Sequence, residues 1–280
     1  MILAPLRGVT IRCFREVFAQ IIGDCGFTEA FTPFISAMPG LSALSDRELA
    51  GVDAAREPVR LTPQFIGKDP QALKRCLEEV RAAGYETADL NCGCPFPMVR
   101  NKGRGSGLLK NRDLFRRMIE AGVEAMGEGK FSIKARIGVD RRDELLELMP
   151  VVNEYPLRFL TVHGRLARQM YEGVCDFSMV AEIERTSKVP VMRNGDLEWR
   201  GGKGMVGRSF IRHLGEREDI GELLCAYIEA SRRELHGEKP VLGRMKELIA
   251  YWKDTPRWSR RWQLVKISRD LDELRQACVS

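Results

Sequence analysis

The sequence predicts an α/β protein: an (α/β)8 barrel of the TIM type, lacking or not showing its seventh helix, followed by a small C-terminal helical domain. Two observations lead to this prediction. Over roughly the first 210 of the 280 residues, eight short apolar runs alternate with amphipathic stretches. After about residue 212 the strand patterns stop and only helical patterns continue. We therefore expect a barrel domain over residues 1–212 and a helical domain over residues 213–280.

The strand candidates are short and mostly apolar. They cover residues 1–5, 26–31, 61–67, 87–93, 131–138, 158–164, 189–195 and 203–208. Helical patterns lie between most of them, for example over residues 69–84 and 111–127, where apolar residues recur at three- and four-residue spacing. Such alternation implies parallel strands joined by crossover helices. Eight candidates favour a closed barrel over an open, doubly wound sheet.

One interval does not fit this pattern. Only ten residues, GDLEWRGGKG, separate Asn194 from Met205. A crossover between parallel strands usually needs a dozen residues or more, including a helix. Either the seventh helix is missing, or residues absent from this sequence connect the two strands.

The C-terminal part is helical and basic. Residues 216–235, 242–254 and 258–277 predict three helices. From Lys239 onwards ten basic residues stand against five acidic ones, so five of the six net positive charges lie in the last 42 residues. A near-neutral body with a basic tail indicates a polyanionic partner for the tail.

Composition excludes several classes of protein. Hydrophobic residues make up 44%, which fits a globular protein with a core, and no stretch approaches the length of a membrane span. We therefore expect a cytoplasmic protein that does not bind a membrane. The eight cysteines are scattered, unlike those of a disulfide scaffold. Only Cys92 and Cys94 lie close together, without a second Cys or His pair nearby, so we expect no metal site.

The strongest candidate for chemistry is the segment 89–109, DLNCGCPFPMVRNKGRGSGLL. A strand ends there, so Asn91 and Cys94 would lie at the C-terminal mouth of the barrel, where TIM-barrel enzymes keep their active sites. Glycines at 103, 105 and 107 would let the following loop approach a ligand closely. The simpler interpretation is a buried structural cysteine followed by an ordinary turn.

Other strand ends favour the functional interpretation. Polar residues follow five further strands at the same end: Gln64; Lys134 and Arg136; His163 and Arg165; Asn194; and Gly207 with Arg208. Taken singly, Lys134 could form a salt bridge and His163 could be a core imidazole. Together they would be expensive to bury without a ligand. A glycine followed by an arginine also suits a phosphate group near the last two strands.

In these residues the chain resembles the tRNA-dihydrouridine synthases. That family's ordered motifs A-P-M-x-G-V-T-D, Q-x-x-G, N-x-G-C-P, K-x-R, H-G-R, N-G-D and M-x-G-R correspond here to residues 4–10, 64–67, 91–95, 134–136, 163–165, 194–196 and 205–208. The resemblance covers about residues 1–210. The tail, especially GRMKELIAYWKD, more loosely resembles the C-type bacterial subfamily.

The resemblance implies an FMN enzyme that reduces uridine in tRNA to 5,6-dihydrouridine, with NADPH as electron donor. Reduced flavin would deliver a hydride to C6 of the uracil, and Cys94 would give a proton to C5. A thiol is mostly protonated at neutral pH and can act as an acid. Cofactor contacts are implied for Pro5, Gln64, Lys134, His163, Asn194, Gly195, Asp196, Gly207 and Arg208. Substrate contacts are implied for Asn91, Arg136 and Arg165.

The chain departs from the family's pattern in the loop after Cys94. The family usually carries a lysine two or three residues past the proline, where this chain has Pro97 and Met98. We therefore expect one contact to substrate to be missing.

Two rival functions remain open from the sequence. One is an FMN barrel that acts on a free pyrimidine, of the dihydroorotate or dihydropyrimidine dehydrogenase type. Such enzymes place a cysteine in a similar setting but tend to follow C-P with Asn, where this chain has Phe96, and they have no use for a basic tail. The other is a non-catalytic RNA-binding protein on a decayed barrel, supported only by the short seventh crossover.

In the tail, Arg257, Arg260 and Arg261 cluster with Trp258 and Trp262. We expect the tryptophans to anchor a helix and the arginines to contact tRNA phosphates, with the flavin site elsewhere, in the barrel. The simpler alternative is that the tryptophans pack in the helical domain and the arginines are merely solvated.

Overall fold

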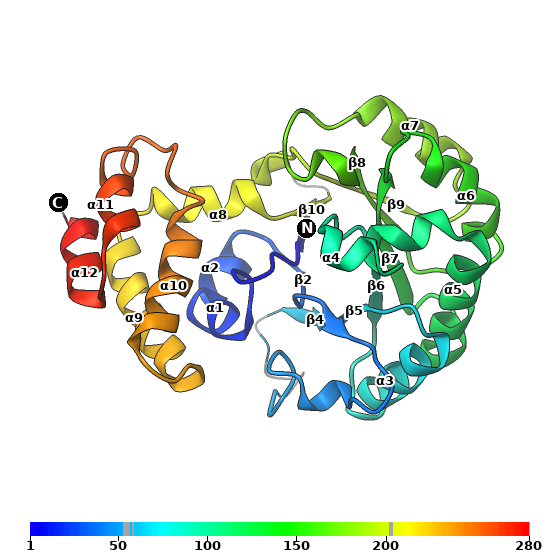
Figure 1. The fold of residues 1–280 in the computed structure, drawn as a ribbon, viewed down its shortest axis with the longest axis horizontal. Helices are drawn as coiled ribbons and strands as arrows, with labels where there is room; N and C mark the ends of the chain where they lie inside the picture. The colour runs from blue at the N-terminus through cyan, green and yellow to red at the C-terminus, as the bar shows by residue number, and fades with distance from the viewer. Residues whose placement is uncertain (53–56, 58, 202–203, 280) are drawn as a thin grey trace.

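In the computed structural model, residues 1–52, 57, 59–201 and 204–279 are described. Figure 1 shows a sheet ringed by helices on one side and a group of C-terminal helices on the other, joined through α8 (Arg208–Gly215). Among the helices of the described residues, none has the length and apolarity of a membrane span.

All pairings in the sheet are parallel. Its order is β3-β5-β6-β7-β8-β9-β10-β1-β2-β4. The strands are β1 (Ile2–Leu3), β2 (Glu29–Phe31), β3 (Ile35–Ser36), β4 (Arg60–Thr62), β5 (Gln64–Ile66), β6 (Ala88–Cys92), β7 (Phe131–Gly138), β8 (Leu160–Leu166), β9 (Val191–Asn194) and β10 (Met205–Val206).

The two ends of this order meet, because β4 and β5 are two halves of one strand interrupted at Pro63. Proline has no N–H to donate, which explains a break in the ladder at this residue. The chain there passes from pairing with β2 to pairing with β6, and β2 and β3 similarly share one strand position. The sheet is thus an eight-position parallel barrel, as predicted.

Strand residues alternate between the inside and the outside of the barrel. On β7, Ile133 and Ala135 belong to the large core beneath the helices, whereas Ser132, Lys134 and Arg136 project into the barrel. A small apolar cluster, including Phe31 and Phe159, fills part of the interior. Much of the remaining interior is polar, and its polar side chains come from the strands themselves.

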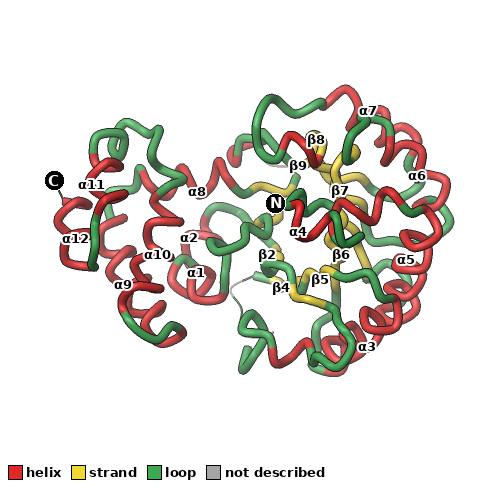
Figure 2. The backbone as a smooth tube through the Cα atoms, in the orientation of Figure 1, coloured by secondary structure: helices red, strands yellow, loops and turns green. Residues whose placement is uncertain are grey.

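Helices cover the outside of the barrel, as Figure 2 shows in red around the yellow strands. They are α1 (Arg12–Val17), α2 (Ala19–Asp24), α3 (Pro70–Ala82), α4 (Pro97–Arg100), α5 (Arg112–Met126), α6 (Glu144–Val152), α7 (Phe177–Thr186) and α8, with short 3-10 turns η1 (Ala43–Ser45), η3 (Gly105–Lys110), η4 (Ala167–Gln169) and η5 (Trp199–Gly201). The helix expected over 69–84 begins where the Asp69 side chain accepts the N–H groups of Gln71 and Ala72.

The seventh crossover has no α-helix in its described part. Between β9 and β10 the structure has only η5, and Met205 pairs directly with Asn194. The expected strand 203–208 is shorter, Met205–Val206, and its first residue, Lys203, lies outside the described residues. Even so, β10 pairs with both β9 and β1, so the short connection still allows the barrel to close.

The described part of the C-terminal segment, up to residue 279, forms four helices rather than the three expected: α9 (Ile220–Glu234), α10 (Glu238–Ile249), α11 (Arg261–Ile267) and α12 (Leu271–Val279). The expected helix over 258–277 was wrong, because local hydrogen bonds start a new helix near Asp270. Its carboxylate accepts the N–H of Glu273, and the Glu273 carboxylate accepts the N–H of Arg269. The Asp270 side chain thus caps the start of α12, and Glu273 holds the preceding residue, Arg269, beside it.

Two buried tryptophans join the helical segment to α8. The indole N–H of Trp252 donates to the Ile211 carbonyl at 2.6 Å, and that of Trp258 donates to the Gly215 carbonyl at 2.7 Å. The two rings contact each other at 4.8 Å between centroids. A Cβ on Gly215 would lie 2.5 Å from Trp252, so only glycine allows this close approach.

We predict that Trp252→Ala lowers the free energy of unfolding by about 3–5 kcal/mol, because it leaves a cavity and an unpaired Ile211 carbonyl. Trp262→Ala is the matched control, since Trp262 is only half-buried and should cost clearly less. Urea unfolding followed by circular dichroism measures both. Equal losses would contradict the central role given to Trp252.

Candidate active site

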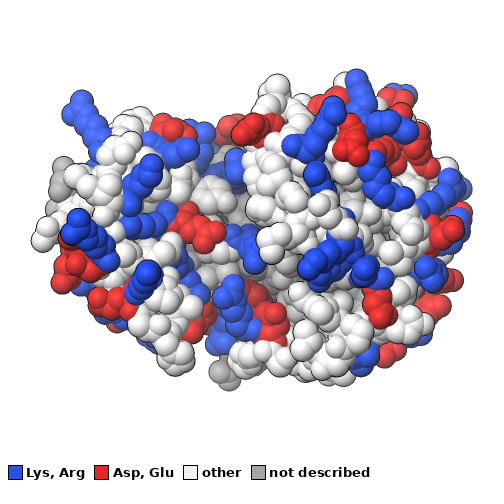
Figure 3. Space-filling model, in the orientation of Figure 1, with Lys and Arg blue, Asp and Glu red and all other residues white. Residues whose placement is uncertain are grey.

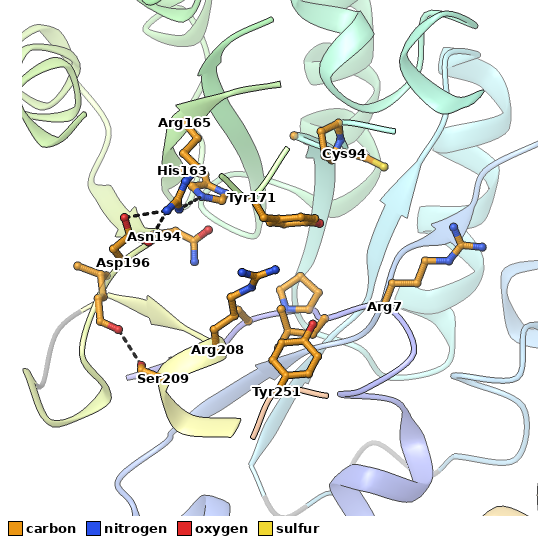
Figure 4. Close-up of a pocket in the computed structure, with 18 of the residues that line it drawn as sticks. Arg7, Cys94, His163, Arg165, Tyr171, Asn194, Asp196, Arg208, Ser209 and Tyr251 are labelled. Carbon is orange, nitrogen blue, oxygen red and sulfur yellow. Dashed lines mark hydrogen bonds and ion pairs between the residues drawn. The ribbon is translucent and has the colours of Figure 1, made fainter. Parts of the chain in front are cut away.

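A cavity of about 640 Å³ opens at the carboxyl ends of the strands. It brings together twelve of the sequence-predicted residues: Pro5, Asn91, Cys94, Lys134, Arg136, His163, Arg165, Asn194, Gly195, Asp196, Gly207 and Arg208. Figure 4 shows several of them pointing into one space, with Cys94 on one side and Arg208 on another. Residues from six strand ends thus meet, as expected for parallel strands.

Cys94 is held by its own loop. The Asn91 side-chain oxygen accepts the N–H groups of Gly93 at 3.1 Å and Cys94 at 2.8 Å, and the Ser106 hydroxyl donates to the Cys94 carbonyl. A Cβ on Gly105 would lie 2.8 Å from Cys94 Cβ, so the glycine-rich loop lies directly against the thiol residue. Burial raises the pKa of Cys94, which keeps the thiol protonated at neutral pH.

Gln64 lies beneath the cavity rather than on its surface. Its amide oxygen accepts from the Asn91 amide at 2.8 Å, and its amide nitrogen donates to Asp89 at 2.8 Å. Ser132 donates to the other Asp89 oxygen. Because the carboxylate can only accept when ionised, it fixes which end of Gln64 faces Asn91. Burial raises the pKa of Asp89 to about 7. The ionised carboxylate that accepts from Gln64 and Ser132 is therefore the main form only above neutral pH.

Lys134 is a cation without a carboxylate partner among the described residues. Its ammonium donates to the Asn194 side-chain oxygen at 2.8 Å, while the Asn194 amide donates to the Met205 carbonyl. Burial and the nearby Arg136 lower the pKa of Lys134 to about 8. These two hydrogen bonds, through Asn194, link β7 to β9 and β10 at the barrel mouth.

The predicted pair Arg165 and His163 is joined to Asp196. Arg165 forms an ion pair with Asp196 at 2.6 Å and donates to the His163 Nε2 at 3.2 Å. Because arginine cannot accept, His163 Nε2 is the acceptor and the ring proton lies on Nδ1. Burial lowers the pKa of His163 well below its usual value, and the surrounding cations lower it further, so the ring is neutral.

Arg136 is buried and committed to backbone. It donates to the Gly93 carbonyl at 2.9 Å and to the Leu166 carbonyl at 2.9 Å, which ties the Cys94 loop to β8. Burial lowers the pKa of Arg136 to about 10. The guanidinium also lies 5.4 Å from the ring centroid of Tyr171, so part of it faces the cavity.

The end of the cavity near Gly195 and Gly207 suits an anion. At Gly195 φ is +129°, and a Cβ there would lie 2.2 Å from the Cys175 sulfur, so this position requires glycine. Gly207 precedes α8, whose N-terminus has no side-chain cap, and Arg208 and Ser209 also line the cavity there. Free N–H groups at a helix N-terminus with an adjacent guanidinium favour a phosphate.

The residues present fit an anionic cofactor of the flavin mononucleotide type. Lys134, Arg136 and Arg208 line the cavity without a carboxylate partner in the described part of the chain. Arg136 is buried and Lys134 is half-buried, whereas Arg208 is exposed. Withdrawing cations such as the first two from water is unfavourable unless an anion joins them. Among the described residues, no group of His, Cys, Asp and Glu is arranged to hold a metal ion.

Sequence reasoning missed Arg7, Tyr171 and Tyr251, which also line the cavity. Tyr171 follows Met170, whose φ of 52° turns the chain inward after β8. The sequence signal was the aromatic residue six positions after Arg165, close to a strand end. Tyr251 gave no such signal, because it belongs to the helical segment. The expectation that this segment lies apart from the cofactor cavity was therefore wrong: Glu247, Ala250 and Lys253 line it too.

The tail arginines lie away from the cavity. Arg257 donates to the Arg217 carbonyl, Arg261 lies 6.0 Å from the Trp258 ring centroid, and Arg260 is exposed. Trp258 is buried just before α11, and Trp262 is half-buried within it, so the two tryptophans do not share one continuous helix. Pro97 and Met98 form the start of α4 at the rim, with Met98 81% exposed.

The fold and the cavity define an (α/β)8 barrel with a pocket rich in cationic side chains, at the end where barrel enzymes keep their active sites. Comparison with known proteins then identifies the family. The chain belongs to the dihydrouridine synthase (Dus) family, whose model matches residues 2–201.

Among curated proteins, tRNA-dihydrouridine synthase B of Vibrio vulnificus is 28% identical over 199 residues, which is 71% of this chain and 60% of the relative. The Xanthomonas campestris protein of the same name is 30% identical over 200 residues, which is 71% of this chain and 58% of the relative. The Serratia marcescens protein of this name is 27% identical over 263 residues, which is 85% of this chain and 77% of the relative. The chain thus spans about 60% of the length of the first two. These relatives have the B-type name, and the looser C-type likeness of the tail stays a prediction.

Solved structures with a similar fold include morphinone reductase in complex with tetrahydroNAD, with a TM-score of 0.53 and 11% identity over 76% of this chain and 83% of that one. The old yellow enzyme homologue from Zymomonas mobilis has a TM-score of 0.53 and 12% identity, over 75% of this chain and 85% of that one. At this level of identity the likeness concerns the fold alone.

The low pKa of Lys134 predicts a pH-dependent stability. An unfolded lysine titrates near pH ~10.4, so between pH 8 and that value the unfolded chain binds more protons, and rising pH stabilises the fold. Below pH 8 the full penalty of the buried charge is present. In flavin-free protein, Lys134→Met should therefore be more stable than the parent at pH 7 by about 1–2 kcal/mol, a value reduced because the cavity admits water.

Urea unfolding at pH 7, 8, 9 and 10 measures this difference. The advantage of Lys134→Met should shrink as the pH rises above 8. Lys130→Met, at an exposed lysine that precedes the same strand, is the control and should show no such trend. If Lys134→Met were more stable than the parent by the same free energy at all four pH values, the lowered pKa of Lys134 would be refuted.

Proposed function

We propose that the chain reduces uridine in tRNA to 5,6-dihydrouridine, with FMN as bound cofactor and NADPH as electron donor. The observation that carries this proposal is a protonated thiol, Cys94, facing a cationic cavity within a chain of the Dus family. The cytoplasm, where we expect the protein to act, supplies both tRNA and NADPH. We further propose that residues 1–212 bind FMN and carry the chemistry, and that residues 213–280 bind tRNA.

Lys134, Asn194, Gly195, Gly207 and Arg208 would hold the cofactor. When bound, FMN supplies hydride chemistry that no amino-acid side chain provides. Arg208 and the α8 N-terminus would bind the phosphate, and Lys134 would stabilise negative charge on the ring system. Pro5, Gln64, His163 and Asp196 complete the proposed set, with Gln64 acting from below through Asn91.

Cys94 would donate a proton to C5 of the uracil, and Asn91 holds the cysteine loop in place for this step. Arg136 and Arg165 would contact the substrate from the β7 and β8 side of the cavity. The target base must leave its stack to enter the cavity, at a cost of a few kcal/mol that tRNA contacts would offset. Neutral His163 neither competes for the Cys94 proton nor adds a further positive charge.

The experiment that tests the function begins with the absorbance spectrum of the purified protein. A flavin spectrum, followed by NADPH-dependent formation of dihydrouridine in tRNA, would support the proposal. A colourless protein that still binds tRNA would favour the non-catalytic alternative. Turnover of free uracil or orotate without activity on tRNA would favour the free-pyrimidine dehydrogenase.

We predict that Cys94→Ala still binds FMN and tRNA but reduces uridine at least ~10²-fold more slowly, the usual effect of losing a general acid. Single-turnover reduction of tRNA by the pre-reduced protein measures this step. Cys92→Ala is the control, because Cys92 faces the core on the outer side of β6. Normal turnover in Cys94→Ala would reject the acid assignment.

The tail arginines predict a salt-dependent effect on tRNA affinity. Replacing Arg257, Arg260 and Arg261 by Ala should weaken binding and make log K less steep against log salt, by roughly 0.7–0.9 per lost phosphate contact. Flavin content should not change, because none of the three lines the cavity.

A control variant should remove Arg112, Arg117 and Arg185, three exposed arginines of the outer barrel helices. It loses the same charge and should keep the slope. If the tail variant keeps affinity and slope, the tRNA surface lies elsewhere, and Arg100, Lys102 and Arg104 at the barrel rim would be tested next.

A further inference from the structure

Arg208 lies between two tyrosine rings. Its guanidinium carbon is 4.6 Å from the ring centroid of Tyr171 and 5.7 Å from that of Tyr251. Figure 4 shows the arginine between the two rings inside the cavity. Tyr171 comes from the barrel, after β8, whereas Tyr251 comes from the helical segment, just after α10. One cationic side chain of the cavity is therefore held from both parts of the chain.

Tyr251 is fixed by its neighbours. Its N–H donates to the Leu248 carbonyl at 3.1 Å, and the next residue, Trp252, is buried and bonded to the Ile211 carbonyl of α8. A second contact holds α10 close to the barrel mouth: Glu247 leaves no room for a Cβ on Gly8, where φ is +80°. These contacts place the backbone of Tyr251 at the barrel mouth, where its side chain lines the cavity.

The arrangement leaves most N–H donors of Arg208 free, because its other contacts are ring faces and one hydrogen bond with the Tyr251 hydroxyl. A ring attracts a guanidinium through the negative charge of its face. The N–H donors of a guanidinium point outward in its plane, in a fork that matches a phosphate. Contacts to carbon rings do not use up these donors, whereas an ion pair with a carboxylate would. In the described part of the chain, Arg208 has ring contacts and no carboxylate ion pair.

We infer that Tyr251 is a positioning residue for the cofactor: it holds Arg208 ready for the phosphate of FMN, so that the helical segment forms part of the cofactor site. This inference rests on the proposed FMN function. Pre-ordering a long side chain lowers the entropy lost on binding. Because the coupling of two sites is reciprocal, cofactor binding also favours the docked position of the helical segment.

The tyrosine hydroxyl also lies next to Arg208. Burial raises the pKa of Tyr251, and the charge of Arg208 and a hydrogen bond from its side chain to this hydroxyl partly oppose the rise. The ring face and the hydroxyl therefore both contact Arg208. Tyr251→Phe keeps the ring face and should preserve most of the function of the residue, whereas Tyr251→Leu keeps apolar volume but removes the aromatic face.

The test is the affinity of flavin-stripped full-length protein for FMN and for riboflavin, measured by quenching of flavin fluorescence. We expect Tyr251→Leu to weaken FMN binding about tenfold and Tyr251→Phe to stay within about threefold of the parent. Riboflavin lacks the phosphate, so its affinity should be the same in all three proteins. Trp262→Leu, at an aromatic residue of the same segment that does not line the cavity, is the control.

A double-mutant cycle separates positioning from general structural damage. In an Arg208→Ala background, Tyr251→Leu should have no further effect on FMN affinity, because the residue to be positioned is gone. An additive loss, or an equal loss for riboflavin, would overturn the inference, as would unchanged FMN affinity in Tyr251→Leu. A parent protein that binds neither FMN nor riboflavin would instead reject the proposed flavin function itself.

Discussion

The alternation of side chains along a closed parallel barrel is the constraint on which this structure depends. Every second strand residue must point into the interior, and here many of those residues are polar. On β6 they are Asp89 and Asn91, and on β7 Ser132, Lys134 and Arg136. Asp89, Ser132 and Arg136 are almost fully buried, so each of these groups needs an internal partner.

The partners arrange the site as a consequence. The chain of hydrogen bonds from Ser132 through Asp89 and Gln64 to Asn91 ends on the backbone N–H of Cys94. The backbone of Cys94 is therefore held by a hydrogen-bond network that includes the carboxylate of Asp89, two residues before Asn91 on β6. On β7 and β9, the ammonium group of Lys134 likewise donates a hydrogen bond to the Asn194 side chain. The groups that form hydrogen bonds in the barrel interior also position the residues of the candidate site.

The strand-end residues could be predicted from the sequence because parallel strands present their carboxyl ends at one edge. Alternation by two then placed Lys134 and Arg136 on the same face, and the structure brings both into the cavity. Sequence periodicity also gave α3 and α5 nearly as observed. These predictions need only local patterns and one rule about the fold.

What the sequence missed depends on contacts between distant segments. The place of Gln64 beneath the cavity follows from its bond to Asp89, which strand assignment alone does not reveal. The break between α11 and α12 rests on side-chain bonds of Asp270 and Glu273, whereas the apolar spacing suggested one helix. Tyr251 enters the cavity because Trp252 docks on α8, some 40 residues away in the chain.

Because the helical segment docks on α8, the two parts of the chain share this helix and the walls of the cavity. The shared tryptophan contacts make α8 part of both the barrel and the helical packing. The cavity has walls from β7 and β8 on one side and from Tyr251 and Lys253 on another. An anion bound beside Arg208 would compensate the unpaired cations of the barrel and, through Tyr251, favour the docked helices. One ligand would in this way both neutralise cations of the barrel interior and stabilise the position of the helical segment.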